Sequence, residues 1–209
     1  MTEIIVIAVL AAILGLDVNA VGRIMVSRPI ICAPLVGYIL GDVKSGLWIG
    51  IIIELLWIGD IPLGAAIPYD TTVLSVITAY WGIEAVPGYP GSMMLAMAVA
   101  IPAMVLHNKL KISLRYLNIR IAHWVETGVI NNKEDRIAKG IFMGILFNFL
   151  KNLVFYLAIL FPGKLLVNLV FQQLPFDVVR MLEISIWLLP LAGIGIVLVS
   201  FHGKFPCPK

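Results

Sequence analysis

The chain has 209 residues, of which 61% are hydrophobic and 13% are charged, and its mean hydropathy is +1.02. This composition excludes an ordinary soluble domain, and the continuous apolar runs lack the alternation that marks the strands of a membrane β-barrel. We therefore expect one all-α integral membrane domain over residues 1–209, with roughly five to seven inserted segments of about 20 residues each. The net charge of +3 is informative only through its distribution.

The first three apolar segments, residues 4–16, 30–40 and 47–58, contain about 11 to 13 residues each. As straight helices they would be roughly 17 to 20 Å long, which is less than the roughly 30 Å of a hydrocarbon core. They predict broken or re-entrant helices, which are tolerated inside protein or along a wet cavity and which carry substrate sites in transporters. Short helices of a soluble core are the less favoured alternative.

Arg28 and Pro29 begin the second of these segments. Proline is favoured in the first turn of a helix because the N–H that it lacks would have no helical partner there. We expect Arg28 to be a structural counter-ion for Asp17 or Asp42 rather than a ligand.

Residues 41–46 predict a turn between two helices. Gly41 would end the first helix, and Asp42 or Ser45 would cap the second. Lys44 lies in the same turn, and a purely structural role for the turn is the favoured interpretation.

Glu54 lies in the middle of the third apolar segment. A carboxylate at such a position costs about 2.5 to 3.5 kcal/mol on insertion scales, so it is expected to face a cavity, a partner or a substrate. In a helix, Trp57 and Gly50 would share its face, and an acid, an aromatic ring and bare backbone together favour a sugar site. A structural pair between Glu54 and Lys44 or Arg28 is the alternative.

Residues 59–70 are too rich in glycine and proline for a regular helix. Because irregular backbone at membrane depth must find partners, this loop is expected to line the same cavity as Glu54. Asp70 could bind a substrate hydroxyl or cap the helix that begins at Thr71, and one carboxylate could do both. The expected substrate site comprises Glu54, Trp57, Gly64, Ala65, Tyr69 and Asp70.

Residues 71–86 and 93–106 flank a turn at residues 87–91 and predict a hairpin of two spanning or near-spanning helices. In residues 106–124, large apolar side chains recur at three- and four-residue steps, with Lys111 and Arg115 on another face. This pattern predicts an amphipathic helix at the membrane interface, and an arm packed on a partner subunit is a nearly equal alternative.

Residues 128–135 predict a polar turn, and residues 137–161 are long enough to span a membrane although Asn148, Lys151 and Asn152 interrupt them. Residues 165–174 are short, and residues 184–201 predict a span broken by Pro190. The domain thus divides into an N-terminal half at residues 1–106, a basic connection at residues 107–136 and a C-terminal half at residues 137–209.

The histidines and cysteines do not form a catalytic or metal-binding pattern. His107 and His123 lie on the basic amphipathic stretch and His202 near the terminus, so none is placed for covalent phosphoryl transfer. Cys32 and Cys207 fit neither a disulfide framework nor a metal site. We therefore expect no enzymatic activity from this chain alone, no cofactor and no nucleic-acid partner.

Residues 28–70 resemble the membrane IIC subunit of the mannose/fructose/sorbose family of bacterial sugar phosphotransferase systems. The matching positions, in order, are Arg28-Pro29, Leu35-Val36-Gly37, Leu40-Gly41-Asp42, Glu54, Gly64-Ala65-Ala66 and Asp70. The resemblance implies a multi-pass subunit of the bacterial inner membrane that works with a IID subunit in a homo-oligomeric complex. It also implies elevator-like movement of a hexose-type sugar and its delivery to the phosphorylated IIB protein, which IIA serves.

Two departures accompany this resemblance. Pro62 stands where mannose-type members carry an asparagine shortly before the Gly-Ala-Ala motif, so mannose is not the expected sugar. Family members also commonly continue beyond the stretch that matches residues 184–201, so the second half is expected to be shortened. The alternative function is a non-transporting IIC-like scaffold or sensor for cytoplasmic phosphotransferase proteins.

The charge distribution predicts the orientation of the chain. Acids outnumber lysines and arginines by seven to three in the first 100 residues, whereas residues 107–139 contain seven lysines and arginines. By the positive-inside rule this basic stretch should be cytoplasmic. Single cysteines at Asn131 and Asn132, in a Cys32→Ser/Cys207→Ser background, should therefore resist an impermeant thiol reagent in intact cells and react after lysis. Labelling in intact cells would contradict this orientation.

Overall fold

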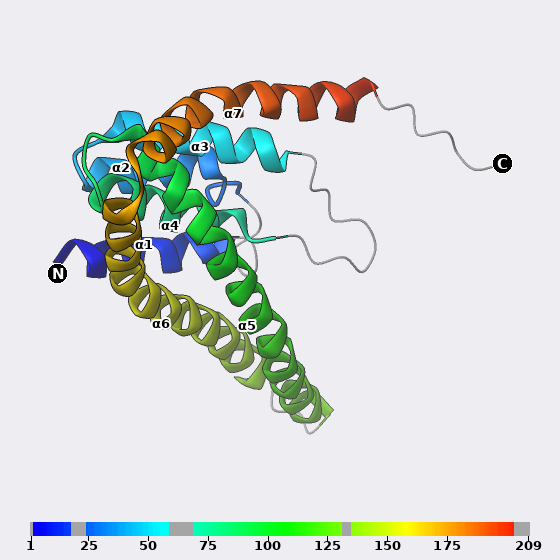
Figure 1. Cartoon of the computed structure of the whole chain (residues 1–209). Helices are drawn as coiled ribbons and strands as arrows, with labels where there is room; N and C mark the ends of the chain where they lie inside the picture. The colour runs from blue at the N-terminus through cyan, green and yellow to red at the C-terminus, as the bar shows by residue number, and fades with distance from the viewer. Residues whose placement is uncertain (1, 18–23, 59–68, 131–134, 203–209) are drawn as a thin grey trace.

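A computed structural model of the chain describes residues 2–17, 24–58, 69–130 and 135–202, and the regular structure in these ranges is helical (Figure 1). The helices are α1 (Thr2–Asp17), α2 (Pro29–Ile39), α3 (Val43–Trp57), α4 (Thr71–Glu84), α5 (Pro90–Ile130), α6 (Asp135–Gln173) and α7 (Phe176–His202). Three stretches, Pro90–Gly128, Asp135–Gln173 and Phe176–Val199, are long and apolar enough to cross a membrane. The all-α membrane fold and the three short N-terminal helices are confirmed.

The short helix α4 is the centre of the core. Every residue from 72 to 83 is buried, and α4 contacts α1, α2, α3, α5 and α6. A helix that is buried on every face needs side chains that are apolar or whose polar atoms form hydrogen bonds within the protein. Ser75 meets this need by donating its hydroxyl to the Thr72 carbonyl oxygen at 2.9 Å. With 14 residues, α4 is shorter than a bilayer span, so of the two forms predicted for residues 71–86 it fits the near-spanning one.

Helices α2 and α3 form a hairpin whose backbones touch through glycines. A Cβ atom on Gly50 would lie 2.7 Å from the Pro29 carbonyl oxygen, and one on Gly46 would lie 2.6 Å from the Ala33 carbonyl oxygen. Gly50 is therefore covered by α2, and the expectation that it offers bare backbone to a ligand is wrong. Small residues on one helix face allow this close approach, as they do in many membrane proteins.

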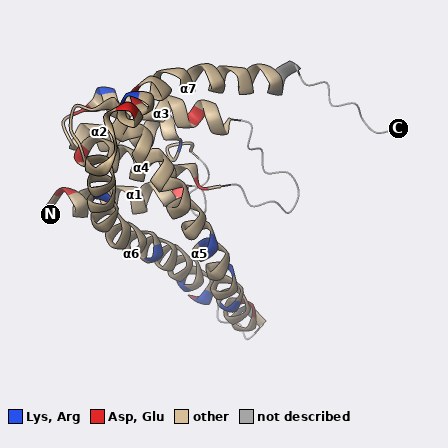
Figure 2. Ribbon diagram, viewed as in Figure 1, with Lys and Arg blue, Asp and Glu red and all other residues tan. Residues whose placement is uncertain are grey.

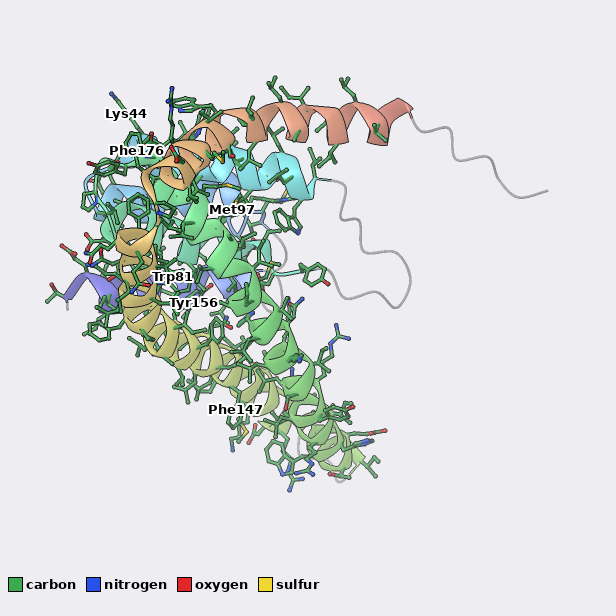
Figure 3. All side chains as sticks on the ribbon, in the orientation of Figure 1. Lys44, Trp81, Met97, Phe147, Tyr156 and Phe176 are labelled. Atoms are coloured by element: carbon green, nitrogen blue, oxygen red, sulfur yellow. The ribbon has the colours of Figure 1, made fainter. Side chains whose placement is uncertain are left out.

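The turn between these helices has the predicted chemistry. Gly41 has a φ of +81°, and the Asp42 N–H donates to the Gly37 carbonyl oxygen at 2.8 Å, which ends α2. The Asp42 carboxylate caps α3 by accepting hydrogen bonds from the Ser45 N–H at 3.1 Å and the Ser45 hydroxyl at 2.5 Å. Lys44 is exposed and projects from the outer end of the hairpin (Figure 3).

Helices α5 and α6 leave the core side by side and end together at the far tip of the molecule (Figure 1). We call residues 108–130 and 135–151 the α5–α6 arm, and Figure 2 shows that many lysines and arginines lie on it. Near the tip, the Arg136 guanidinium lies 5.0 Å from the centre of the Trp124 ring. The stretch at residues 106–124 is therefore the middle of a continuous 41-residue helix and not a separate interfacial helix.

Helix α6 likewise joins two segments that were expected to be separate, residues 137–161 and 165–174. Pro162 lies inside it, and α4 packs against this point. The Trp81 indole N–H donates to the Leu160 carbonyl oxygen at 3.0 Å, and Lys164 forms an ion pair with Glu84. These contacts from α4 explain why the helix continues through a proline that the sequence alone marks as a break. The domain divisions expected at residues 106 and 136 thus fall inside α5 and α6.

Helix α7 packs on α3 and α5 and leaves much of its apolar surface exposed. The Trp187 and Trp48 rings lie 5.1 Å apart, and Gly193 approaches Leu55 closely. The remaining face carries large exposed side chains: Ile184, Leu188, Leu191, Ile194, Leu198 and Val199. Such a surface is typical of a helix that lies against lipid or another chain.

The α2–α3 contact predicts that replacement by alanine has different effects on stability at two glycines. Gly50→Ala should destabilise the protein by about 1 to 3 kcal/mol because the new methyl group must push α2 away. Gly144→Ala on α6 should be neutral or stabilising by up to about 1 kcal/mol, since its Cβ would meet no atom within 4 Å. Thermal unfolding of the purified proteins in detergent, followed by circular dichroism, measures both. Equal midpoints would contradict the close α2–α3 contact.

Candidate functional site

The turn before α2 is fixed by one buried carboxylate. Asp17 Oδ1 accepts a hydrogen bond from the Ile24 N–H at 2.7 Å, and Asp17 Oδ2 accepts from the Ser27 N–H at 3.2 Å and the Ser27 hydroxyl at 3.0 Å. Met25 has a φ of +67°, a left-handed conformation that non-glycine residues adopt rarely. The Thr72 hydroxyl donates to the Ser27 carbonyl oxygen at 2.8 Å. Helices α1 and α4 therefore fix the position from which α2 starts.

Arg28 follows this turn and pairs with Glu54. The guanidinium NH1 lies 3.1 Å from Glu54 Oε1, with the Arg28 side chain half exposed and Glu54 only 20% exposed. The expected pairing of Arg28 with Asp17 or Asp42 is wrong, because Asp17 holds the preceding turn and Asp42 caps α3. The Arg28–Glu54 contact that the sequence allowed for is present, and whether it serves structure or substrate stays a prediction.

The two carboxylate oxygens of Glu54 differ in their hydrogen bonding. Oε2 is buried and accepts no hydrogen bond from the residues that the structure describes. An ionised carboxylate can accept about four hydrogen bonds, so Glu54 retains acceptor capacity after pairing with Arg28. The Arg28–Glu54 pair therefore offers both guanidinium donors and an open acceptor at one place.

The position of Glu54 follows from the glycine contacts of the hairpin. Gly46, Gly50 and Glu54 are spaced four residues apart and lie on the same face of α3. Gly50 touches Pro29 and Ile30 at the start of α2, and the next residue on this face, Glu54, reaches Arg28. Pro29 occupies the first turn of α2 as predicted.

The other expected site residues are placed only in part. Trp57 is the last residue of α3, is partly buried and packs against the hydrophobic core. Tyr69 lies two residues before the start of α4 and is 51% exposed. Gly64 and Ala65, like Pro62, lie outside the described residues, so their part in a substrate site stays a prediction.

Asp70 is the residue directly before α4, and its side chain binds α5. Its backbone carbonyl oxygen accepts from the Val73 N–H at 3.1 Å, but its carboxylate makes no capping hydrogen bond. Instead Asp70 Oδ2 accepts from Lys111 Nζ at 3.3 Å and lies 3.6 Å from His107 Nδ1. The Asp70 side chain is only 8% exposed. Asp70 therefore does not cap α4 with its side chain, as one interpretation of the sequence had it, but is the buried counter-ion of α5; binding of a substrate hydroxyl by Asp70 stays a prediction.

A polar cluster continues from Asp70 into α6. His107 Nε2 lies 3.1 Å from Asn152 Oδ1, and the His107 ring packs against Phe155 with 4.7 Å between ring centres. Lys151 lies within electrostatic reach of Asp70. Sequence reasoning assigned no role to these residues, although polar side chains inside an apolar segment are themselves a signal of function.

Both predicted site carboxylates are linked to the start of α2: Glu54 pairs with Arg28, and Thr72, two residues after Asp70, donates to the Ser27 carbonyl oxygen. Glu54, Asp70 and Asp17 are all close enough to the buried Cys32 thiol to act on it electrostatically. The Cys32 thiol donates to the Val26 carbonyl oxygen at 3.3 Å, which places it directly beside the turn that Asp17 fixes. A single cavity lined by Glu54 and Asp70 stays a prediction.

Asp70→Asn should destabilise the protein by about 3 to 5 kcal/mol, since it leaves the buried Lys111 ammonium without its carboxylate. Glu126→Gln is the matched control, because Glu126 is an exposed carboxylate that pairs with the exposed His123. It should leave stability unchanged. Thermal unfolding in detergent compares the two variants, and an unaltered midpoint for Asp70→Asn would disprove the structural role of this pair.

Comparisons with known proteins give a consistent family. The family model described as "PTS system sorbose-specific IIC component" matches residues 1–204. The mannose-specific EIIC component of Escherichia coli is 28% identical over 136 residues, covering 65% of this chain and 49% of that protein. The fructose permease IIC component of Bacillus subtilis is 34% identical over 98 residues, covering 47% of this chain and 36% of that protein. The chain spans about half the length of the curated relatives it matches.

Two solved structures share the fold. One, described only as a membrane protein, has a TM-score of 0.78 and is 21% identical in sequence. The match covers 98% of this chain and 81% of that protein's chain. The other, a cryo-EM structure of the mannose transporter ManYZ in complex with a microcin, has a TM-score of 0.68 at 21% identity over 99% and 82% of the two chains. Because the family model matches almost the whole sequence, this chain belongs to the family of sorbose-type IIC components of the phosphotransferase system.

Proposed function

We propose that the chain is the sugar-binding and sugar-translocating IIC permease subunit of a phosphoenolpyruvate-dependent phosphotransferase system. The observation that carries this proposal is the Arg28–Glu54 pair, in which a buried carboxylate oxygen remains open within a membrane domain of the IIC family. A charge in such a setting is costly and is usually kept for a substrate. The names of the relatives include mannose, fructose and sorbose, which favours a hexose-type substrate.

The site has the chemistry that a neutral polyol requires. Glu54 Oε2 would accept a hydrogen bond from a sugar hydroxyl, and the Arg28 N–H groups that bond to none of the described residues would donate to a neighbouring oxygen. Trp57, one turn further along α3, would supply an apolar ring for the C–H face of the sugar. Tyr69, Asp70, Gly64 and Ala65 complete the proposed site. Asp70 is the weaker ligand, because its carboxylate already binds α5.

Transport would require partners. We infer that a IID membrane subunit completes the carrier and that the core moves in an elevator-like manner, in line with the ManYZ likeness in fold. The exposed apolar face of α7 and the α5–α6 arm are surfaces on which such a partner or lipid could lie. Phosphorylation of the sugar would then be the task of the cytoplasmic IIB protein, which IIA serves, in a homo-oligomeric complex.

Glu54→Gln should weaken sugar binding by the complex of this chain with its IID partner. A hydrogen bond to a charged group is worth about 1.5 to 3 kcal/mol, which corresponds to a roughly tenfold or larger rise in Kd. Binding of radiolabelled mannose, fructose and sorbose to the purified complex measures the change. This chain alone, reconstituted in liposomes, should show no uptake above empty vesicles, because alternating access needs two structural halves.

The matched control is Glu84→Gln. Glu84 is 27% exposed, close to the 20% of Glu54, and it also pairs with a cation, Lys164, but at the opposite end of α4 from the site. It should leave the Kd unchanged. Equal affinity of the Glu54→Gln and wild-type complexes would refute the site assignment, and sugar binding without transport by the wild-type complex would favour the scaffold or sensor role.

A further inference from the structure

The α5–α6 arm contains a cavity of about 680 Å³ between its two helices. Near the tip the helices are in contact, since a Cβ on Gly140 would collide with Val125. At the core end they are joined again by the His107–Asn152 contact. Between these points they separate, and a Cβ on Gly144, which lines the cavity, would meet no atom within 4 Å. The cavity is therefore an open groove between two contact points.

The end of the groove nearest the core carries an excess of positive charge. Lys111, Arg115 and Lys151 line it, and Asp70 is the carboxylate that lies beside Lys111 and within electrostatic reach of Lys151. Lys151 Nζ is inaccessible to solvent and has no hydrogen-bond partner among the described residues. A buried ammonium without a partner is unfavourable, so this end of the groove is suited to an anion. Asn118 adds an amide to the lining.

The remainder of the groove is mostly apolar, with the exposed Glu126 and the amide of Asn148 as polar members of its lining. Its lining includes Leu114, Ile121, Val125, Ile137, Ile141 and Ile145. A small inorganic anion would use the cations and leave this apolar surface in contact with water. An amphiphile with one anionic group would satisfy both ends, and α5 and α6 are both apolar enough to lie in a bilayer, where such molecules are present.

We propose that the groove of the α5–α6 arm binds an anionic phospholipid, with the phosphate on Lys111 and Lys151 and the first part of the acyl chains along the apolar lining. Charge complementarity selects the headgroup, because a zwitterionic lipid would bring its own cation to a site that already has an excess of them. The site is distinct from the Arg28–Glu54 pair, and the proposal does not depend on which sugar the chain carries.

Native mass spectrometry of the full chain tests this assignment. Delipidated protein in detergent is incubated with phosphatidylglycerol or with phosphatidylcholine of the same acyl chains, and the bound fraction is measured for each. The wild-type protein should retain phosphatidylglycerol preferentially. Lys151→Gln should reduce that retention roughly fivefold, as expected for the loss of one lysine near an anionic lipid. Gly144→Leu should block binding by filling the groove.

Lys109→Gln and Lys139→Gln are the matched controls. Both lysines lie on the same two helices and are exposed, but neither lines the groove. They should retain phosphatidylglycerol as the wild-type protein does. Lys151→Gln breaks no hydrogen bond between described residues, and Gly144→Leu replaces a glycine by a better helix former, so both should fold, with helical content by circular dichroism as the check.

Three results would overturn the proposal. The first is equal retention of the two lipids by the wild-type protein, or equal retention of phosphatidylglycerol by the wild-type, Lys151→Gln and Gly144→Leu proteins. The second is a phosphate adduct that forms with inorganic phosphate alone and displaces the lipid, which would indicate a small-anion site. The third is a dimer whose formation excludes the lipid, which would indicate that a second copy of the chain covers the groove.

Discussion

The buried contact between Asp70 and Lys111 determines how the rest of the molecule is assembled. It joins the start of the central helix α4 to the point on α5 where that helix leaves the core, and the neighbouring His107–Asn152 contact extends the junction to α6. The Asp70 carboxylate is buried and the Lys111 side chain is only 13% exposed, so the carboxylate depends on the ammonium beside it. The direction of the α5–α6 arm relative to the core is therefore fixed by a charge pair, with packing of His107 on Phe155 beside it.

Glu54 and Asp70 resemble one another in sequence, as isolated acids in apolar surroundings, but the structure gives them different chemistry. Asp70 contacts Lys111 and His107 of α5, whereas Glu54 pairs through one oxygen with a half-exposed arginine, and its other oxygen accepts no hydrogen bond from the described residues. In a carrier, a ligand group must bind the sugar and release it again, so a carboxylate with spare acceptor capacity is the better candidate. We infer that Glu54 is the main sugar ligand and that Asp70 primarily maintains the junction beside it.

The α5–α6 arm combines positive charge with apolar helices. Its lysines and arginines lie along helices that are also apolar enough to span a membrane, and part of that charge faces a groove between the helices instead of solvent. Lys109 and Lys139 are exposed, whereas the Lys151 ammonium is buried and has no hydrogen-bond partner among the described residues. The groove is therefore the place on the arm where the charge has the greatest need of a ligand.

The sequence by itself determined the all-α membrane class, the short N-terminal helices and the α2–α3 turn, because these depend on local composition, segment length and capping residues. It also singled out Glu54, since a mid-segment acid is conspicuous, and it allowed for a pair with Arg28. Only the tertiary structure decided that residues 106–124 continue α5 and that α6 passes through Pro162, because contacts from distant helices outweigh local breaks. The partners of Asp70 were decided in the same way: Lys111 lies 41 residues further along the chain, and only the packing of α4 against α5 brings the two charges together.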